Sequence, residues 1–390
     1  MRNVIIAPDS FKGALSAQSF CRIVAEEVEK IFPRCKVRSL PIADGGEGTV
    51  DSLLLASGGR RVSLPVHGPF FQEVPGFYGL LPDGETAILE MAAAAGLPLA
   101  LHNPNPCKTT TYGVGQLLRH AVFKSGARKL LLGLGGSATN DGGCGMAAAL
   151  GVVFRNRDGV SFVPTGETLK DICTIDPSPA RALLAGISIQ ALCDVDNPLF
   201  GPNGAAFVFA PQKGATEEMV RQLDDGLRHY GALLERLPGG AGVCSLPGGG
   251  AAGGLGAGLS ALLGASLSPG ADLLLDAAGF DRMLPSCDLV ITGEGQLDSQ
   301  SLRGKAVLSV CRRAKAKGVP VAAFAGAVSG EEQGAYDQGL TAVFPINRQL
   351  LSLEEALTKT GENLRAAARN LMRLIKAAEQ MAPRSDSLSE

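Results

Sequence analysis

The sequence has no tryptophan and few other aromatic side chains, with 15 phenylalanines and 4 tyrosines among 390 residues. Proteins that hold single-stranded nucleic acid usually stack its bases on aromatic rings, so this composition disfavours that function. The formal net charge is only −2. No broad basic field is therefore present to attract nucleic acid or an anionic membrane. We expect neither as a partner, and we expect a small soluble ligand instead.

Cysteine and histidine lack the spacing of disulfide or zinc sites. The nine cysteines are an odd number, are scattered along the chain and form no Cys-x-x-Cys pair. The four histidines are equally dispersed. These patterns argue against a disulfide framework and a zinc site. Together with the lack of a secretory leader pattern at the start of the chain, they predict a cytoplasmic protein.

Residues 237–271 contain no charged side chain, but they do not read as a membrane span. Pro238, Pro247 and Pro269 interrupt the segment together with several glycine clusters. A spanning helix needs about 20 consecutive apolar residues that satisfy their own backbone groups. We expect a buried glycine-rich loop that leads into a helix at 254–263.

The chain is rich in glycine, and four loops that mix glycine with charged or hydroxyl residues each follow an apolar, strand-like segment: 7–13, 43–49, 133–143 and 292–305. In open α/β sheets, ligands bind at the carboxyl ends of strands, where these loops should gather. The third loop precedes a segment of small residues typical of a helix. Its amides can then face an anion, and we expect phosphate there, although ordinary tight turns are also built this way.

The order of elements predicts an α/β protein with two α/β domains. Residues 1–67 and 285–379 are expected to form one discontinuous, doubly wound parallel-sheet domain of the Rossmann or flavodoxin-like type. A hairpin pattern at 73–91 marks a change to antiparallel pairing. We therefore expect residues 68–284 to be an inserted second α/β domain with a mixed sheet, with the active cleft between the domains. Residues 380–390 are expected to be a disordered tail.

Along nearly the whole chain, from residue 1 to about residue 377, the sequence resembles the bacterial type of the glycerate kinase family. Six segments carry the resemblance in order: Pro8-Asp-Ser-Phe-Lys-Gly13, Ala43-Asp-Gly-Gly-Glu-Gly-Thr49, Gly133-Leu-Gly-Gly-Ser-Ala-Thr-Asn-Asp-Gly-Gly143, Cys193-Asp-Val-Asp-Asn-Pro-Leu199, Gly249-Gly-Ala-Ala-Gly-Gly-Leu-Gly256 and Thr292-Gly-Glu-Gly-Gln-Leu-Asp298. The resemblance implies transfer of the γ-phosphoryl group of ATP to D-glycerate with Mg²⁺. It favours the 2-hydroxyl as acceptor over the 3-hydroxyl.

Phosphoryl transfer requires a cradle for the nucleotide phosphates, which we assign to the third loop. The nucleotide-binding candidates supply backbone amides and side-chain donors: Gly135, Gly136, Ser137, Thr139 and Asn140. Asp141 would repel phosphate unless a metal intervenes, so it has another task. Helix capping is the alternative for Ser137 and Asp141.

Asp194 and Asp196 follow the apolar strand expected at 187–193 and therefore emerge at its carboxyl end. We assign Asp194 as the base that accepts the proton of the glycerate hydroxyl or holds the hydroxyl in line. Lys12 is the second catalytic candidate, because its ammonium can meet the transferred phosphoryl group or the substrate carboxylate. A solvated lysine is the alternative there. The candidate metal ligands are Asp196, Glu294 and Asp298.

The remaining polar residues of the loops are candidates for glycerate binding: Ser10, Asp44, Glu47 and Arg303. Arg303 matters because a guanidinium matches a carboxylate with two parallel hydrogen bonds. Asp44 and Glu47 can hydrogen-bond the glycerate hydroxyls or face magnesium. A turn or capping role is the alternative for Glu47.

Two other functions stay open at this stage. A dinucleotide-dependent oxidoreductase acting on a small hydroxy acid would also use glycine loops, but Pro8-Asp-Ser-Phe-Lys-Gly13 stands where Gly-x-Gly-x-x-Gly is expected. A non-catalytic sensor of a small acid is the second alternative. The sequence also leaves open whether the chain forms a homo-oligomer.

Overall fold

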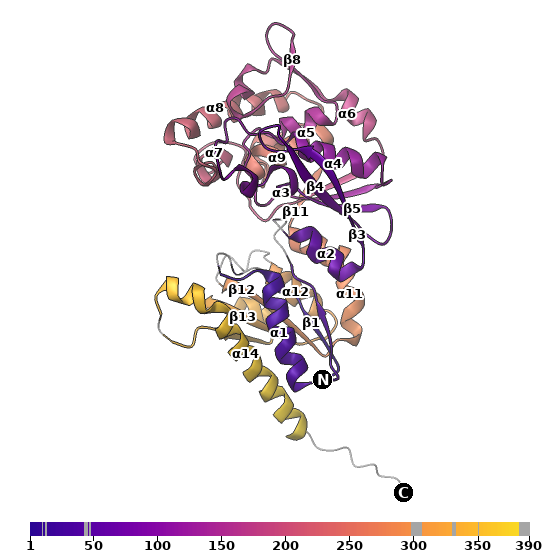
Figure 1. Ribbon diagram of the computed structural model, residues 1–390, viewed down its shortest axis with the longest axis vertical. Coiled ribbons are helices and arrows are strands. Elements are labelled where there is room, and N and C mark those ends of the chain that lie inside the picture. Colours follow the sequence, from indigo (N-terminus) through magenta and orange to yellow (C-terminus); the bar gives the residue numbers. More distant parts are fainter. Residues whose placement is uncertain are drawn as a thin grey trace. The chain divides into compact units, whose positions relative to one another are not determined.

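The computed structural model describes residues 1–9, 11, 14–42, 46, 48–297, 306–329, 333–349 and 351–381. The chain packs into two compact units, which we call unit 1 (residues 1–42 and 274–390) and unit 2 (residues 43–273). Figure 1 shows the helices and strands of both units. The sequence-based domain boundaries and the cleft expected between the domains remain predictions.

Unit 1 is built on a five-stranded sheet in the order β14-β13-β12-β1-β2. Its strands are β1 (Asn3–Ile6), β2 (Lys36–Ser39), β12 (Leu289–Leu297), β13 (Val321–Val328) and β14 (Ala342–Pro345). All four pairings are parallel, as the alternating strand and helix patterns predict. The central strands are buried over most of their length, which is the pattern of a parallel sheet covered on both faces.

The helices of this unit are α1 (Ala17–Ile31), α11 (Phe280–Met283), α12 (Ala306–Lys315), α13 (Gln333–Asp337) and α14 (Leu353–Met381), with a 3₁₀ turn at Leu284–Ser286. Helix α10 (Gly270–Ala277) spans the limit between the units. Ser16 caps the start of α1 and accepts a hydrogen bond from the Ser19 amide at 3.2 Å. Helix α14 reaches Met381, two residues into the segment predicted as a tail, and the rest of that segment lies outside the described residues.

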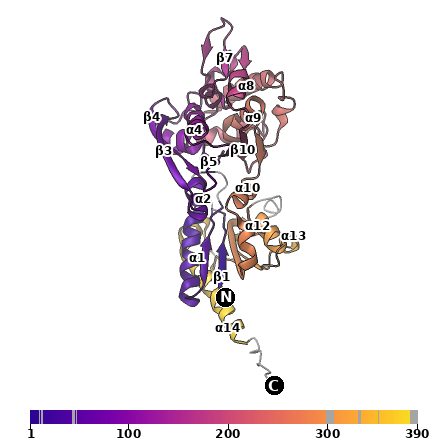
Figure 2. The same cartoon turned by 90° about the vertical axis from the view of Figure 1, so that its right-hand side faces the viewer.

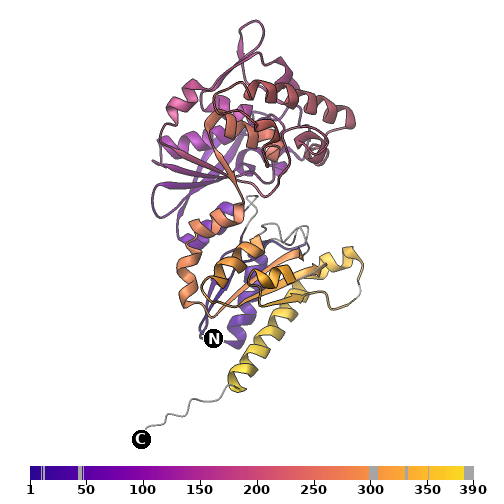
Figure 3. The same ribbon diagram turned by 180° about the vertical axis from the view of Figure 1, so that it is seen from behind.

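Helices α1 and α14 lie side by side and cover one face of the five-stranded sheet (Figures 1 and 2). From behind, α14 is the long yellow helix in Figure 3. Phe20 and Val24 of α1 and Leu364 of α14 belong to the apolar cluster that joins these helices to β1, β12 and β13. Glu27, only 1% exposed, accepts hydrogen bonds from Arg365 at 3.0 Å and Arg369 at 2.8 Å. These partners lower the pKa of Glu27 to about 2.

Unit 2 contains a six-stranded sheet in the order β11-β10-β6-β5-β4-β3. Its strands are β3 (Arg60–His67), β4 (Glu73–Leu80), β5 (Thr86–Glu90), β6 (Lys129–Gly133), β10 (Ser188–Leu192) and β11 (Ser266–Ser268). Strands β4 and β5 form the predicted hairpin. Strand β3 pairs with β4 and so lies in this sheet, whereas the sequence analysis assigned it to the first sheet. The pairing partner of a strand depends on contacts that its own residues do not specify.

Two successive antiparallel pairings make β3 run in the same direction as β5. Strands β5, β6, β10 and β11 are parallel to one another. The carboxyl ends of β3, β5, β6, β10 and β11 therefore lie at one edge of this sheet. In α/β sheets this is the edge at which ligands bind.

Unit 2 also holds a small antiparallel sheet of β7 (Val153–Arg155), β8 (Ser161–Phe162) and β9 (Thr174–Asp176). Its helices are α2 (Thr49–Ser57), α3 (Ala92–Ala95), α4 (Tyr112–Phe123), α5 (Cys144–Ala149), α6 (Ser178–Leu183), α7 (Ala205–Phe209), α8 (Glu217–Leu234) and α9 (Ala251–Leu263). Short 3₁₀ turns occupy Leu97–Ala100, Gly166–Asp171, Pro211–Lys213 and Val243–Ser245. None of the helices in the part of the chain that the structure describes is long and apolar enough to cross a membrane.

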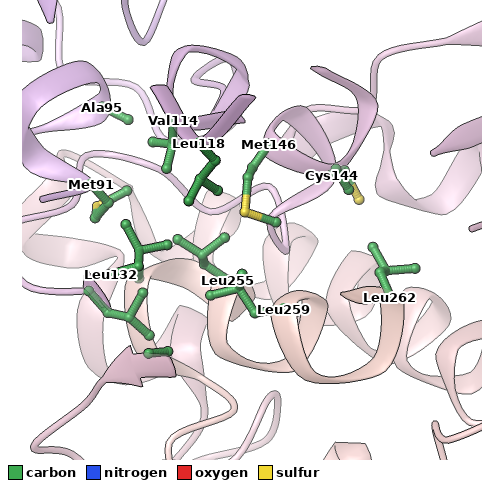
Figure 4. Close-up of a cluster of buried hydrophobic side chains, with 14 of the residues drawn as sticks. Met91, Ala95, Val114, Leu118, Leu132, Cys144, Met146, Leu255, Leu259 and Leu262 are labelled. Carbon is green, nitrogen blue, oxygen red and sulfur yellow. The ribbon is translucent and has the colours of Figure 1, made fainter. Parts of the chain in front are cut away.

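The core of unit 2 joins β6 to α4, α5 and α9. Figure 4 shows Leu132, Met146 and Leu255 from three of these elements converging in one apolar cluster. Helices α4 and α5 pack closely at Gly115, where a Cβ atom would lie 2.3 Å from the Met146 carbonyl oxygen. Helix α9 is kinked at its start, because residues 252–254 all have positive φ angles between 52° and 94°. The helix predicted at 254–263 follows this kink.

Candidate active site

The third glycine loop connects β6 to α5 at the carboxyl edge of the six-stranded sheet, as the strand, loop and helix pattern predicts. Two hydrogen bonds fix it: the Leu97 amide donates to the Gly136 carbonyl and the Ala138 amide donates to the Ala95 carbonyl, both at 2.9 Å. Gly136 is exposed and has a φ angle of +73°, a conformation that favours glycine. The amides of Gly135, Gly136 and Ser137 donate to no described residue. Successive amides of this kind form anion-binding concavities.

The side chains predicted to line the phosphate cradle are buried inside unit 2. Ser137 is 7% exposed, and Thr139 and Asn140 are fully buried. The Asn140 amide group and the Thr139 hydroxyl make no hydrogen bond to any residue that the structure describes. The loop thus presents backbone groups at Gly136 and keeps these side chains inside. Their role as nucleotide ligands stays a prediction.

Lys213 is a functional candidate that the sequence analysis missed. It is only 2% exposed, and its ammonium donates hydrogen bonds to the Ser137 hydroxyl at 2.8 Å and the Thr139 carbonyl at 2.6 Å. Burial lowers the pKa of Lys213 to about 7, and the nearby charge of Asp141 opposes this shift. In the sequence it stands in Ala210-Pro-Gln-Lys-Gly214, which reads as an ordinary surface turn. Only the tertiary structure shows that Lys213 is buried and that it hydrogen-bonds the glycine loop at 133–143.

We expect the stability of Lys213→Met relative to the wild type to be greatest at low pH. The unfolded chain keeps its ordinary lysine pKa of 10.5, so between pH 7 and 10.5 it binds more protons than the folded chain does. The free energy of unfolding of the wild type therefore rises with pH across this window. Below pH 7 the buried Lys213 is charged, so the cost of burying that charge is largest there. The stability difference between variant and wild type should fall by about 3 kcal/mol from pH 6 to pH 9. Urea denaturation at both pH values measures it, and a pH-independent difference would contradict the prediction.

Asp141 is fully buried and accepts four hydrogen bonds. Its Oδ2 accepts from the Thr111 amide and hydroxyl, both at 2.8 Å, and from the Gly145 amide at 3.1 Å, while Oδ1 accepts from the Gly143 amide at 3.0 Å. The carboxylate therefore caps the start of α5 and ties it to the residue preceding α4. The capping alternative for Asp141 is the one that this geometry supports, since no side-chain oxygen is exposed to a metal ion. Burial raises the pKa of Asp141, and the four hydrogen bonds oppose that shift.

Asp194 lies at the next strand end, directly beside the glycine loop. Strands β6 and β10 are paired, and the Leu134 amide extends that pairing to the Leu192 carbonyl at 3.2 Å. The Asp194 side chain is exposed, and its Oδ1 accepts a hydrogen bond from the Gly270 amide at 2.9 Å. This contact orients the carboxylate without burying it. Asp196 is also exposed and follows in the same loop.

The segment at 249–256, which includes the kink of α9, packs against both the glycine loop at 133–143 and the loop that carries Asp194 and Asp196. The Gly250 amide donates to the Asn197 carbonyl at 2.9 Å, and the Gly142 amide donates to the Gly253 carbonyl at 3.0 Å. Gly253 approaches so closely that a Cβ atom would lie 2.1 Å from the Thr139 carbonyl oxygen. Three of the six segments that carry the family resemblance therefore meet at one edge of the sheet.

Glu90 connects the second glycine loop to the same edge, and the sequence analysis also missed it. It ends β5, is 1% exposed, and accepts hydrogen bonds from the Gly48 amide at 3.1 Å and the Val50 amide at 2.5 Å. A carboxylate at this position caps α2, and its negative charge is stabilised by the positive N-terminal end of the helix dipole. The only signal in the sequence is an acid at the end of an apolar strand. Asp44 and Glu47 lie outside the described residues.

In unit 1, the first and fourth glycine loops begin at neighbouring strands. The Asp9 amide donates to the Gly293 carbonyl at 2.8 Å, and the Thr292 hydroxyl donates to the Ala7 carbonyl at 2.7 Å. Glu294 continues β12 and is 5% exposed. The other candidates on these loops lie outside the described residues: Ser10, Lys12, Asp298 and Arg303.

The family resemblance of the sequence implies that the reaction uses magnesium. Among the described residues, no group of three or more His, Cys, Asp or Glu side chains lies close enough together to hold a metal ion. Mg²⁺ at phosphoryl-transfer sites is bound through one or two carboxylates together with substrate phosphates and water. Asp196 has an exposed carboxylate and follows the strand next to the glycine loop, and its role as a magnesium ligand stays a prediction.

Comparisons with known proteins agree with the residue patterns. The model of the "Glycerate kinase family" matches residues 4–376. A glycerate kinase of Bacillus cereus is 46% identical, with 97% of this chain and 99% of that protein covered. A glycerate 2-kinase of Escherichia coli is 40% identical over 94% of this chain and 96% of its own length. A crystal structure assigned as a glycerate kinase 2 from Salmonella typhimurium LT2 has a TM-score of 0.81 and 42% identity, with 97% and 99% coverage. The chain belongs to the glycerate kinase family.

Proposed function

We propose that this chain transfers the γ-phosphoryl group of ATP to the 2-hydroxyl of D-glycerate and releases 2-phospho-D-glycerate and ADP. The observation that carries the proposal is the pairing of an amide-lined glycine loop after β6 with an exposed, oriented carboxylate after β10. Phosphoryl transfer depends mainly on positioning the phosphates, stabilising their charge and orienting the attacking hydroxyl. The name of the Escherichia coli relative supports the 2-hydroxyl as acceptor.

The proposal assigns a role to each candidate residue. The amides of residues 135–137 bind the ATP phosphates, and Ser137, Thr139 and Asn140 support the loop that presents them. Asp194 accepts the proton of the glycerate 2-hydroxyl, because the Gly270 amide fixes one of its oxygens and leaves the carboxylate exposed. In this proposal the Lys12 ammonium stabilises the negative charge of the transferred phosphoryl group. The glycerate ligands in this proposal are Ser10, Asp44, Glu47 and Arg303.

Magnesium accompanies the nucleotide in this proposal. Its candidate ligands are Asp196, Glu294 and Asp298, and the ion would neutralise charge on the β- and γ-phosphates. What supports the assignment is the oxygen chemistry of the donors, which is the kind that Mg²⁺ prefers.

A coupled assay of ADP release tests the function. ADP should form only when ATP, Mg²⁺ and D-glycerate are all present, and ³¹P NMR of the product should show 2-phosphoglycerate. The 3-phosphate as product would reject the proposed acceptor hydroxyl but retain the kinase. No ADP above background, with NAD reduction or silent binding of glycerate instead, would favour the oxidoreductase or the sensor.

Lys213 gives a second test through its contact with the glycine loop. We expect Lys213→Met to lower kcat for D-glycerate by about 100-fold, because loss of two hydrogen bonds lets Ser137 and Thr139 shift and misplaces the phosphate ligands. The variant should remain folded, since it no longer buries a charge. A variant that unfolds at higher temperature than the wild type at pH 6 and yet turns over at the wild-type rate would reject a positioning role for Lys213.

A further inference from the structure

An exposed aromatic cluster lies in unit 2, in a chain with few aromatic side chains. It consists of His67, Phe71 and Tyr112, and we call it the aromatic cluster. Ring centroids are 5.5 Å apart for His67 and Tyr112, 5.8 Å for Phe71 and Tyr112, and 6.1 Å for His67 and Phe71. Phe71 is 41% exposed, while His67 and Tyr112 are half-buried. The Phe71 ring is thus partly open to solvent while it packs against His67 and Tyr112.

Phe71 is held in an unfavourable backbone conformation. Its φ angle is +60°, and Ala252 is the only other non-glycine residue with positive φ in the described part of the chain. For a bulky residue this conformation is strained and requires surrounding structure to hold it. That structure is the turn between β3 and β4: the Gly68 amide donates to the Gln72 carbonyl at 2.6 Å, and the Phe71 amide donates to the Gly68 carbonyl at 3.1 Å. The Phe71 side chain in this turn is exposed and does not belong to the apolar core of unit 2.

His67 is fixed in the cluster by Gln116 of α4, which lies beside β3 and β4 (Figure 2). The Gln116 side-chain oxygen accepts from the His67 amide at 2.8 Å and lies 3.1 Å from His67 Nδ1. An amide oxygen only accepts, so Nδ1 carries the hydrogen. Gln116 therefore orients the His67 ring against Phe71 and Tyr112.

The cluster lies at the sheet edge that also carries the glycine loop. His67 ends β3, whose carboxyl end shares the edge with those of β5, β6 and β10. The segment 109–111 connects the two features, because the Thr110 amide donates to the Pro69 carbonyl at 2.9 Å and the Thr109 hydroxyl donates to the Ala138 carbonyl at 3.0 Å. Strand β3 is three places from β6, so at the usual strand spacing the axes of these two strands lie about 14 Å apart. A nucleoside triphosphate in an extended conformation can bridge a lateral offset of this order.

We propose that the aromatic cluster binds the adenine ring of ATP by stacking on Phe71, with the triphosphate directed along the sheet edge toward Gly135 and Gly136. This inference rests on the proposed function, which supplies ATP as the substrate. Stacking uses the flat face of the base and requires no charged partner. It accounts for an outward phenyl ring held in a strained conformation beside two further rings.

The lack of tryptophan in the chain allows a direct test. Phe71→Trp places the only tryptophan of the chain in the proposed base site, and its emission is excited selectively over that of tyrosine. Phe123→Trp is the matched control, because Phe123 is 49% exposed and ends the same helix α4 that Tyr112 begins. ADP should quench the emission of the first variant in a saturable manner and leave the control unchanged. Inorganic tripolyphosphate, which has no base, should produce little quenching in either.

Steady-state kinetics separate a base site from a merely structural turn. Phe71→Ala should raise KM for ATP by about tenfold, in line with the loss of one stacked base, and leave kcat and KM for D-glycerate within about twofold. An unchanged KM for ATP, or Phe71→Trp emission that saturating ADP does not alter in an enzyme that turns over, overturns the adenine site while leaving the kinase intact. If the wild type releases no ADP from ATP with D-glycerate, the proposed function itself has failed.

Discussion

Replacement of Asp194 by Asn is expected to lower kcat for D-glycerate phosphorylation by 10²- to 10⁴-fold, roughly the range for loss of a general base. The amide oxygen of Asn can still accept the hydrogen bond that Gly270 donates to Asp194 at 2.9 Å, so the loop should keep its geometry. The amide group cannot take the proton of the attacking hydroxyl. ADP release at saturating ATP and D-glycerate measures the effect.

Two controls make the Asp194 result specific. Asp158→Asn changes an exposed carboxylate in the turn that joins β7 to β8, and kcat should stay within about twofold. The melting temperature of the Asp194→Asn variant should match that of the wild type. If Asp194→Asn retains more than a tenth of the wild-type kcat, Asp194 is not the base.

The largest expected effect on stability comes from Asp141→Ala, which we expect to lower the free energy of unfolding by about 3–5 kcal/mol. The substitution leaves the amides of Thr111, Gly143 and Gly145 and the Thr111 hydroxyl without their acceptor inside a fully buried site. It also removes the negative charge that raises the pKa of Lys213. Chemical denaturation at neutral pH measures the loss.

A graded series distinguishes hydrogen bonding from charge at this position. Asp141→Asn keeps one acceptor oxygen, but its amide nitrogen is a donor that would face another donor. Its free energy of unfolding should therefore lie between those of the wild type and Asp141→Ala. Equal stability of Asp141→Ala and the wild type would show that the four hydrogen bonds contribute little. Activity of each variant should be compared below its melting temperature, so that unfolding is not mistaken for lost catalysis.

Local patterns predicted the secondary structure around the site well. The apolar run before Gly133 forms β6, and the small residues after Gly143 form α5. The hairpin pattern at 73–91 forms the paired strands β4 and β5. Each of these features depends on residues that are close together in the chain, so the pattern of apolar, small and turn-forming residues was sufficient to find it.

The environment of the site residues could not be predicted in the same way. Lys213 reads as a surface lysine, yet it is buried against a loop more than seventy residues earlier in the chain. Glu90 caps a helix that begins about forty residues before it. The strand at 60–67 has the same residues whichever sheet it joins, and its partner decides where Phe71 lies.

The sequence by itself determined that glycine loops follow buried strands in an α/β chain, and it carried the motifs of the glycerate kinase family, because both are properties of short segments. The tertiary structure decided which of those polar residues are solvated and which are buried, which donors are left to a ligand, and which carboxylate caps a helix. These outcomes depend on desolvation and on hydrogen-bond partners from distant segments. No local pattern records either of them.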